Sequence, residues 1–291
     1  MTVRFVCDST ADLTAEEAAL FGVAVVPLHV LFGDDDYRDG IDLTPDEFYQ
    51  RMRESSVHPK TSQPSAGDFI TAFANASDDG ASVICTTISA ALSGTFQAAL
   101  QAKVALKDRD IRVLDTRAVT VAHQLVLRAG IAVRDGGGSP DACVEAMERV
   151  METQRLLASL PTLEYLRRGG RIGGAQALLG SFLSIRPVLD VTRGHVEVFQ
   201  KVRTFSRAIN RILEELERAH ASWSSTLAGI AHAGVPDVAQ ELGRRVAVIT
   251  GAPPIVVPIG PVIGCHAGPG AVGVAFARAT DRASQSGRAA P

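Results

Sequence analysis

Short apolar runs alternate with amphipathic stretches along the first half of the chain. The apolar runs predict buried strands, and the stretches between them have the three-to-four-residue apolar spacing of helices. The predicted strands cover residues 3–7, 23–32, 81–86 and 111–114. The predicted helices cover residues 15–21, 45–53, 94–106 and 116–134, with one more after residue 139. Strands that alternate with helices in this way predict a parallel sheet covered on both faces.

Hydroxyl side chains mark the starts of several of these helices. Thr14 is followed three residues later by Glu17, which is the spacing of a capping box. Thr44 begins a similar sequence with a proline at the first helical position, and Ser65 and Ser139 precede the next two predicted starts. These signals set the helix boundaries more firmly than the apolar spacing alone.

The pattern changes after about residue 155, where strands follow one another more directly. Strands are predicted at 156–160, 187–192, 195–201, 226–232 and 255–259. Arg193-Gly194 lies between two of them as a hairpin turn, which introduces antiparallel pairing. A Gly-rich segment covers 169–180, and helices are predicted at 235–250 and 270–279.

The sequence therefore predicts an α/β protein with two domains. Residues 1–155 form an N-terminal domain with a parallel sheet, and residues 156–279 form a C-terminal domain with a mixed sheet. The segment 55–80 is expected to pack on the C-terminal domain. Residues 280–291, rich in Ala, Ser, Arg and Gly, are expected to be a disordered tail.

Charge, cysteine spacing and the lengths of the apolar runs argue against several classes of protein. The 291 residues carry a net charge of −3 with both signs interspersed, which gives no electrostatic case for nucleic-acid binding. The four cysteines are far apart and show no zinc-binding spacing, so reduced thiols, no metal site and a cytoplasmic location are expected. The N-terminus does not resemble a signal peptide, and no uninterrupted apolar run of about 20 residues predicts a spanning helix.

Four clusters of hydroxyl, glycine and proline residues lie beside apolar runs, at 7–10, 61–65, 89–95 and 264–270. Ligands of α/β folds bind in loops at strand ends. These loops offer mainly neutral hydrogen-bond donors, which suit an anion. The sequence therefore predicts an anion-binding site built from strand-end loops.

Each cluster also has a purely structural interpretation. Turn and cap formation alone explains Asp8 and Ser9. Ser93, which precedes Gly94 at a helix start, could cap the helix or present donors to an anion, because one geometry serves both. Thr61 and Ser62 precede a proline and have no evident local role. No nucleophile elbow, P-loop or dinucleotide fingerprint is present in these clusters, so a nucleotide site is not supported.

Six short motifs follow one another along the chain. They read Cys-Asp-Ser-Thr-Ala-Asp-Leu at 7–13, Thr-Ser-Gln-Pro-Ser at 61–65, Ser-Gly-Thr-Phe-Gln-Ala-Ala at 93–99, Leu-Arg-Arg-Gly-Gly-Arg-Ile at 166–172, Lys-Val-Arg-Thr at 201–204 and Gly-Pro-Val-Ile-Gly-x-His at 260–266. As a set they resemble the DegV family of bacterial fatty-acid-binding proteins. The resemblance extends over nearly the whole chain, from residue 3 to about 278.

The resemblance implies a function and a site. It implies one long-chain fatty acid in an apolar tunnel of the C-terminal domain, with the carboxylate near the domain interface. The carboxylate-binding residues would be Thr61 and Ser93, next to Ser62 and Gly94, and His266 would join their network. Such a protein would itself have no catalytic residue and no cofactor.

The resemblance also implies a partner. The bound fatty acid would be presented to a separate fatty acid kinase that holds ATP and Mg²⁺, and the acyl phosphate would then be carried away. Arg171 and Arg203 would contact the phosphate or the kinase near the tunnel mouth. Transient contact with a membrane surface is also expected.

The sequence departs from the family beside the histidine. Cys265 and Ala267 flank His266 where many relatives carry hydroxyl residues, and 119–123 replaces a stretch that usually contains Gly and Ser. Structural interpretations stay open for two site residues: Arg171 lies in a cluster typical of a solvated face, and a lone histidine is typically structural. The alternative functions are a serine hydrolase using Ser93 and His266, and a carrier of another amphiphilic carboxylate.

Overall fold

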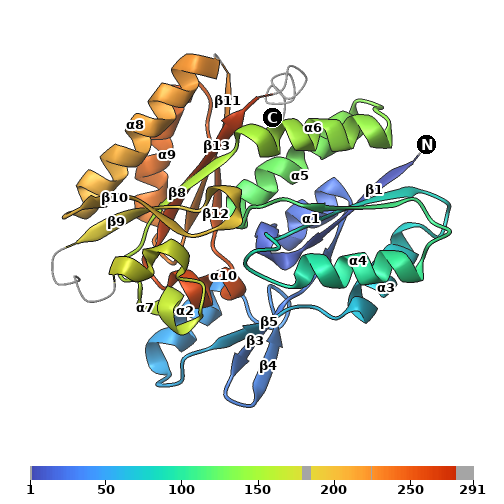
Figure 1. Ribbon diagram of the computed structural model, residues 1–291, viewed down its shortest axis with the longest axis horizontal. Helices are drawn as coiled ribbons and strands as arrows, with labels where there is room; N and C mark the ends of the chain where they lie inside the picture. Colours follow the sequence, from blue (N-terminus) through green and yellow to red (C-terminus); the bar gives the residue numbers. More distant parts are fainter. Residues whose placement is uncertain (1, 179–184, 224, 280–291) are drawn as a thin grey trace.

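The computed structural model describes residues 2–178, 185–223 and 225–279, which form stacked layers of helices and sheets (Figure 1). The N-terminal part contains a four-stranded sheet of order β2-β1-β6-β7 in which every neighbouring pair is parallel. Its strands are β1 (Val3–Asp8), β2 (Val23–Val26), β6 (Ser82–Thr87) and β7 (Ile111–Asp115). The predicted parallel sheet is confirmed.

Helices cover both faces of this sheet. Phe69 and Phe73 pack with Val6 of β1 on one face, whereas Phe5 belongs to the larger core on the other face. The first face is covered by α3 (Ala66–Ala76) and α4 (Thr95–Ala105). The second is covered by α1 (Ala15–Phe21), α5 (Thr120–Asp135) and α6 (Pro140–Thr153). Both faces of β1 are therefore apolar, as expected for a buried parallel strand.

The C-terminal part contains a six-stranded sheet of order β10-β9-β8-β13-β11-β12. Its strands are β8 (Arg155–Ser159), β9 (Arg186–Asp190), β10 (Glu197–Val202), β11 (Thr226–His232), β12 (Ile255–Pro258) and β13 (Val272–Arg278). Only β11 and β12 pair in parallel among these strands. The predicted mixed sheet is confirmed, as is the Arg193-Gly194 turn, where φ is +61° and +78°.

Two helices cover the outer face of the mixed sheet, and α5 and α6 lie between the two sheets (Figure 1). The outer helices are α8 (Phe205–Trp223) and α9 (Pro236–Thr250). Gly229 of β11 allows α5 to approach closely, because a Cβ atom there would lie 2.3 Å from Val121 Cγ2. One pair of helices therefore ties the two sheets together.

A small antiparallel sheet and several short helices complete the fold. The sheet has the order β4-β3-β5, with β3 (His29–Phe32), β4 (Asp35–Arg38) and β5 (Lys60–Ser62). The short helices are α2 (Pro45–Glu54), α7 (Glu164–Arg168), α10 (Pro261–Ala267) and the 3-10 turns η1 (Ser9–Ala11), η2 (Gly173–Leu178) and η4 (Thr192–Gly194). The predicted strand 23–32 is wrong as one strand, because its halves join different sheets.

Two further predictions were wrong. The helix predicted at 270–279 is strand β13, and the helix predicted from residue 116 begins at Thr120. β13 is buried on both faces from Val272 to Ala277, so it lacks the alternation that identifies a half-exposed strand, and its alanines favour a helical interpretation. The expected tail at 280–291 lies outside the described residues, and the domain boundary near residue 155 stays a prediction.

Candidate functional site

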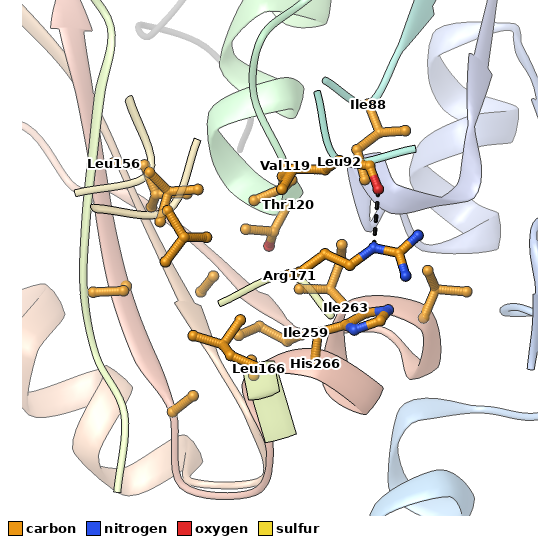
Figure 2. A pocket seen from close by; sticks show the side chains of 18 of the residues that line it. Ile88, Leu92, Val119, Thr120, Leu156, Leu166, Arg171, Ile259, Ile263 and His266 are labelled. Atoms are coloured by element: carbon orange, nitrogen blue, oxygen red, sulfur yellow. Dashed lines mark hydrogen bonds between the residues drawn. The ribbon is translucent and has the colours of Figure 1, made fainter. Parts of the chain in front are cut away.

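A cavity of about 320 Å³ is lined by residues of the mixed sheet, α5, α10, β5 and the loop before α4 (Figure 2). This volume is at the lower end of the range for small-molecule sites, about 300–1,000 Å³. Most of its lining is apolar. The apolar side chains are Leu28, Ile88, Leu92, Val119, Leu156, Ala158, Leu160, Leu166, Leu189, Val191, Val196, Ala231, Ile259, Val262, Ile263, Ala267, Ala271 and Val272.

Polar side chains also line the cavity, and most of them come from the predicted clusters. They are Thr61, Ser62, Gln63, Ser93, Thr120, Arg171 and His266. Five segments that are far apart in sequence, including three of the four predicted clusters, thus meet at one cavity. The Cys7–Thr10 cluster does not line it; Asp8 instead accepts hydrogen bonds from the backbone of Thr10 and Ile88, at 2.9 and 2.6 Å, in the structural role expected.

Thr61 and His266 are in direct contact, with Thr61 Oγ1 3.0 Å from His266 Nε2. Thr61 is held in β5 opposite Val30, and His266 lies in the last turn of α10. The histidine ring packs on the backbone of Gly169, where a Cβ atom would lie 2.0 Å from His266 Nδ1. The Thr-Ser-Gln-Pro segment and the C-terminal histidine therefore meet in the structure, and their binding of a carboxylate stays a prediction.

His266 is a neutral side chain in this environment. Burial lowers its pKa to about 4, and the nearby Arg171 and His58 act in the same direction. Its Nδ1 atom has no hydrogen-bond partner among the described residues. Because the ring is uncharged near neutral pH, it acts at the site as a hydrogen-bonding group and not as a cation.

Ser93 lies directly before the first turn of α4. Its Oγ is 2.9 Å from Thr95 Oγ1 and accepts a long hydrogen bond from the Thr95 N–H, at 3.4 Å. The N-cap residue Gly94 is exposed, does not line the cavity and contacts the Gln63 side chain, since a Cβ atom there would lie 2.1 Å from Gln63 Oε1. Ser93 is thus available to the cavity while Gly94 supports the neighbouring loop.

The two predicted arginines have different positions. Arg171 lines the cavity, where its Nε donates to the Leu92 carbonyl at 3.1 Å and its Nη1 donates to the Gly169 carbonyl at 2.8 Å (Figure 2). Arg203 is exposed just after β10 and does not line this cavity. The structure therefore brings Arg171, and not Arg203, to the predicted head-group residues.

The hydroxyl and imidazole needed for a serine hydrolase do not form a catalytic pair. Ser93 is bonded to Thr95, His266 is bonded to Thr61, and no carboxylate of the described residues is hydrogen-bonded to His266. A low pKa also makes His266 a weak base.

Within the described residues, no group of three or more potential ligands could hold a metal ion, and no helix has the length and hydrophobicity to cross a bilayer.

Three residues near the cavity were not singled out from the sequence. Thr120 lines the cavity, and the carboxylates of Asp12 and Asp39 accept hydrogen bonds from the backbone N–H groups of Gly260 and Val262, at 3.0 and 3.4 Å, where α10 begins. The β-branched run 119–121 disfavours a helix interior and could have placed Thr120 at the start of α5. Nothing local in the sequence predicts that the two carboxylates are buried.

A sequence profile described as "Uncharacterised protein, DegV family" matches residues 2–279. The chain belongs to the DegV family. A DegV domain-containing protein of Deinococcus radiodurans is 38% identical over 290 residues, which cover 95% of this chain and 98% of that protein.

Solved DegV structures have the same fold. A DegV family protein from Thermus thermophilus, described by its fatty acid binding, is 34% identical with a TM-score of 0.89, covering 96% of this chain and 100% of that chain. A stearic-acid-binding protein from Eubacterium ventriosum is 28% identical with a TM-score of 0.88, covering 96% and 98%. The resemblance to the DegV family and the predicted fold class are both confirmed.

Proposed function

We propose that this protein binds one long-chain fatty acid, with the acyl chain in the cavity and the carboxylate at Thr61 and Ser93. The observation that carries this proposal is an apolar cavity with neutral hydrogen-bond donors gathered from separate loops. The DegV family protein from Thermus thermophilus, described by its fatty acid binding, and the stearic-acid-binding protein from Eubacterium ventriosum support it.

The carboxylate is held by hydroxyl groups in this proposal. The hydroxyls of Thr61, Ser62 and Ser93 donate to its oxygens, with the backbone at Gly94 beside them. Hydrogen bonds to a charged acceptor contribute about 1.5–3 kcal/mol each. His266 accepts no proton from the ligand; its Nε2–H donates to Thr61 Oγ1, which leaves the Thr61 hydroxyl free to donate to the carboxylate.

The acyl chain supplies most of the affinity. Removing an apolar chain from water contributes about 0.8 kcal/mol per buried CH₂ group. The hydroxyl groups then fix which end of the ligand lies at Thr61. A carrier of another amphiphilic carboxylate would use the same hydroxyl groups and the same apolar cavity. Identifying the bound lipid therefore distinguishes a fatty-acid-binding protein from such a carrier.

We further infer that the bound carboxylate is presented to a separate ATP-dependent fatty acid kinase. The kinase transfers the γ-phosphoryl group of ATP to a carboxylate oxygen, which leaves ADP and an acyl phosphate on this protein. Arg171 at the cavity and the exposed Arg203 would contact the phosphate or the kinase, since guanidinium groups bind phosphoryl oxygens well. Loading and release of the lipid would involve transient contact with a membrane surface.

Native mass spectrometry of the purified protein tests the proposal. We expect one long-chain fatty acid per chain, exchangeable with added palmitate or oleate. The same preparation is tested with short acyl esters for turnover. Ester turnover that Ser93→Ala abolishes would support the hydrolase alternative and contradict the binding-protein account.

A further inference from the structure

Gly273 lies in the middle of the mixed sheet and lines the cavity. It belongs to β13, which pairs with β8 on one side and with β11 on the other. The register places Ala158 of β8 and Ala231 of β11 directly beside it, and both of these alanines also line the cavity. Three neighbouring strands thus contribute a row of positions with a small side chain or none, and this row is the floor of the cavity.

Close packing of a helix does not explain why position 273 is a glycine. At Gly229 of β11 it does, because a Cβ atom there would lie 2.3 Å from Val121 Cγ2 of α5. At Gly273 the nearest atoms to an added Cβ are Leu156 Cδ1, at 3.2 Å, and Ala158 Cβ, at 3.7 Å, both in the neighbouring strand β8. A glycine weakens the interior of a strand and often marks a place where a ligand comes close to the backbone. The missing side chain at Gly273 therefore leaves room in the cavity.

Gly273 lies on the side of the cavity away from the proposed head-group residues. Figure 2 shows Leu156 across the cavity from Arg171 and His266. The short distance between Leu156 and a Cβ atom at position 273 places Gly273 on the Leu156 side. With the carboxylate bound at Thr61, which contacts His266, the methyl end of the acyl chain lies next to Gly273.

The volume of the cavity limits how many carbon atoms it can hold. An apolar cavity of about 150 Å³ inside a protein binds one benzene molecule, which corresponds to about 25 Å³ per carbon atom. On this scale the cavity of about 320 Å³ has room for about 13 carbon atoms. Lauric and myristic acids are close to that size, whereas stearic acid is longer.

We propose that Gly273 is a specificity-determining residue whose missing side chain sets the length of the bound acyl chain at about 12–14 carbon atoms. The proposal rests on the proposed function, because it takes the carboxylate to be bound at Thr61 and Ser93. A side chain at position 273 would occupy the space of the last carbon atoms of the ligand. A longer acid would leave CH₂ groups outside the cavity, where they add nothing to the affinity.

Competition among saturated fatty acids tests this. Lipid-free protein is equilibrated with pairs of the even-numbered acids from octanoic to stearic acid, and the bound lipids are quantified by native mass spectrometry. We expect the affinity of the wild-type protein to rise about fourfold for each added CH₂ group, the effect of burying one such group, up to lauric or myristic acid. Beyond myristic acid the affinity should rise no further. The acid at which the rise stops is the break point of the series.

Two variants should move the break point in opposite directions. Gly273→Val adds three carbon atoms to the cavity floor and should move the break point to decanoic acid. Leu156→Ala removes three carbon atoms from the same side and should move it to palmitic acid. The matched controls Ala228→Val and Leu157→Ala change buried residues that pack with α8 and α9 outside the cavity lining, and they should leave the break point unchanged. If Gly273→Val does not fold, Ala158→Val adds two carbon atoms to the same row and gives the same readout.

Two failures can be told apart. If the acids bind but the affinity of the wild-type protein keeps rising through stearic acid, or if Gly273→Val and Leu156→Ala share the wild-type break point, the role of Gly273 is wrong and fatty-acid binding stands. If none of the acids binds, the proposed function itself is wrong.

Discussion

Thr61 and His266 join two parts of the chain that are 205 positions apart in one short contact. The imidazole is neutral in this contact near neutral pH, because burial lowers its pKa to about 4. In the proposed site, His266 is a positioning residue for the Thr61 hydroxyl. Ser93 lines the cavity from a different loop, and in the proposed site it supplies the second donor.

Removing either hydroxyl should weaken fatty-acid binding without unfolding the protein. We expect Thr61→Ala and Ser93→Ala each to cost about 1–3 kcal/mol of affinity, because the ligand carboxylate loses one donor. Thr71→Ala, at an exposed threonine of α3, is the matched control. Lipid-exchange titrations measure the effect, and unchanged affinity in both site variants would remove these residues from the site.

Asp39 should make stability depend on pH. Burial raises its pKa from 3.8 to about 6, the nearby Asp8 adds to this, and hydrogen bonds from Ser9 and Val262 oppose it. A raised pKa means that the folded state holds the proton more tightly than the unfolded state. The stability that Asp39 contributes is therefore fully present below about pH 4 and is lost as the pH rises through about 6.

The variant Asp39→Asn isolates this effect. Between about pH 4 and pH 7, the free energy of unfolding of the wild-type protein should fall relative to that of the variant by about 3 kcal/mol, the equivalent of about two pKa units. Denaturant titrations at several pH values provide the measurement. A constant difference across that range would mean that Asp39 does not titrate as described.

Helix α10 connects the small sheet to the cavity. Its first turn is bonded to Asp12 and Asp39, its middle packs closely on α2, where a Cβ atom at Gly264 would lie 2.5 Å from Phe48 Cε1, and its last turn holds His266. The sequence predicted a glycine-rich loop here, since short glycine-containing helices lack a strong local signal. Packing against α2 and the bonds to Asp12 and Asp39, all from segments distant in sequence, support this helix.

Gly169 should be required for the position of His266. Gly169→Ala would place a Cβ atom 2.0 Å from His266 Nδ1 and so displace the ring, while its own backbone, with φ of −76°, accepts alanine. We expect about a tenfold loss of fatty-acid affinity, or about 1.4 kcal/mol. Gly174→Ala, where the nearest atom would be 3.6 Å away, is the control and should bind normally. Equal affinities would show that the ring is not held by this contact.

Sequence patterns predicted some elements better than others. The capping boxes at Thr14 and Thr44 form as predicted, and the hairpin at Arg193-Gly194 forms as well, because each depends on neighbouring residues alone. β13 was predicted as a helix because both its faces are buried by elements distant in sequence. Errors therefore occur where tertiary packing, and not local chemistry, determines the structure.

The cavity is a property of the whole molecule. Its lining comes from the mixed sheet, α5, α10, β5 of the small sheet and several loops, so no single segment predicts it. Motif order placed Thr61, Ser93, Arg171 and His266 at one site. The sequence could not show which of Arg171 and Arg203 lies at the cavity, because their distances from it depend on how η2 and β10 pack.

The two arginines should act after lipid binding. We expect Arg171→Ala and Arg203→Ala to leave fatty-acid affinity nearly unchanged and to lower the rate of phosphorylation by the partner kinase about tenfold or more, since lost phosphoryl contacts raise the barrier by about 1.4 kcal/mol or more. Arg244→Ala on the exposed surface of α9 is the control. Loss of fatty-acid binding in Arg171→Ala, with normal phosphorylation of the lipid that remains, would reverse the assigned roles.

A crystal structure of the protein loaded with one long-chain fatty acid tests the central claim most directly. The account predicts electron density for the acyl chain inside the cavity and a carboxylate within hydrogen-bond distance of Thr61 Oγ1 and Ser93 Oγ. A carboxylate bound instead beside Thr120 and Asp12, or a lipid bound outside the cavity, would contradict it.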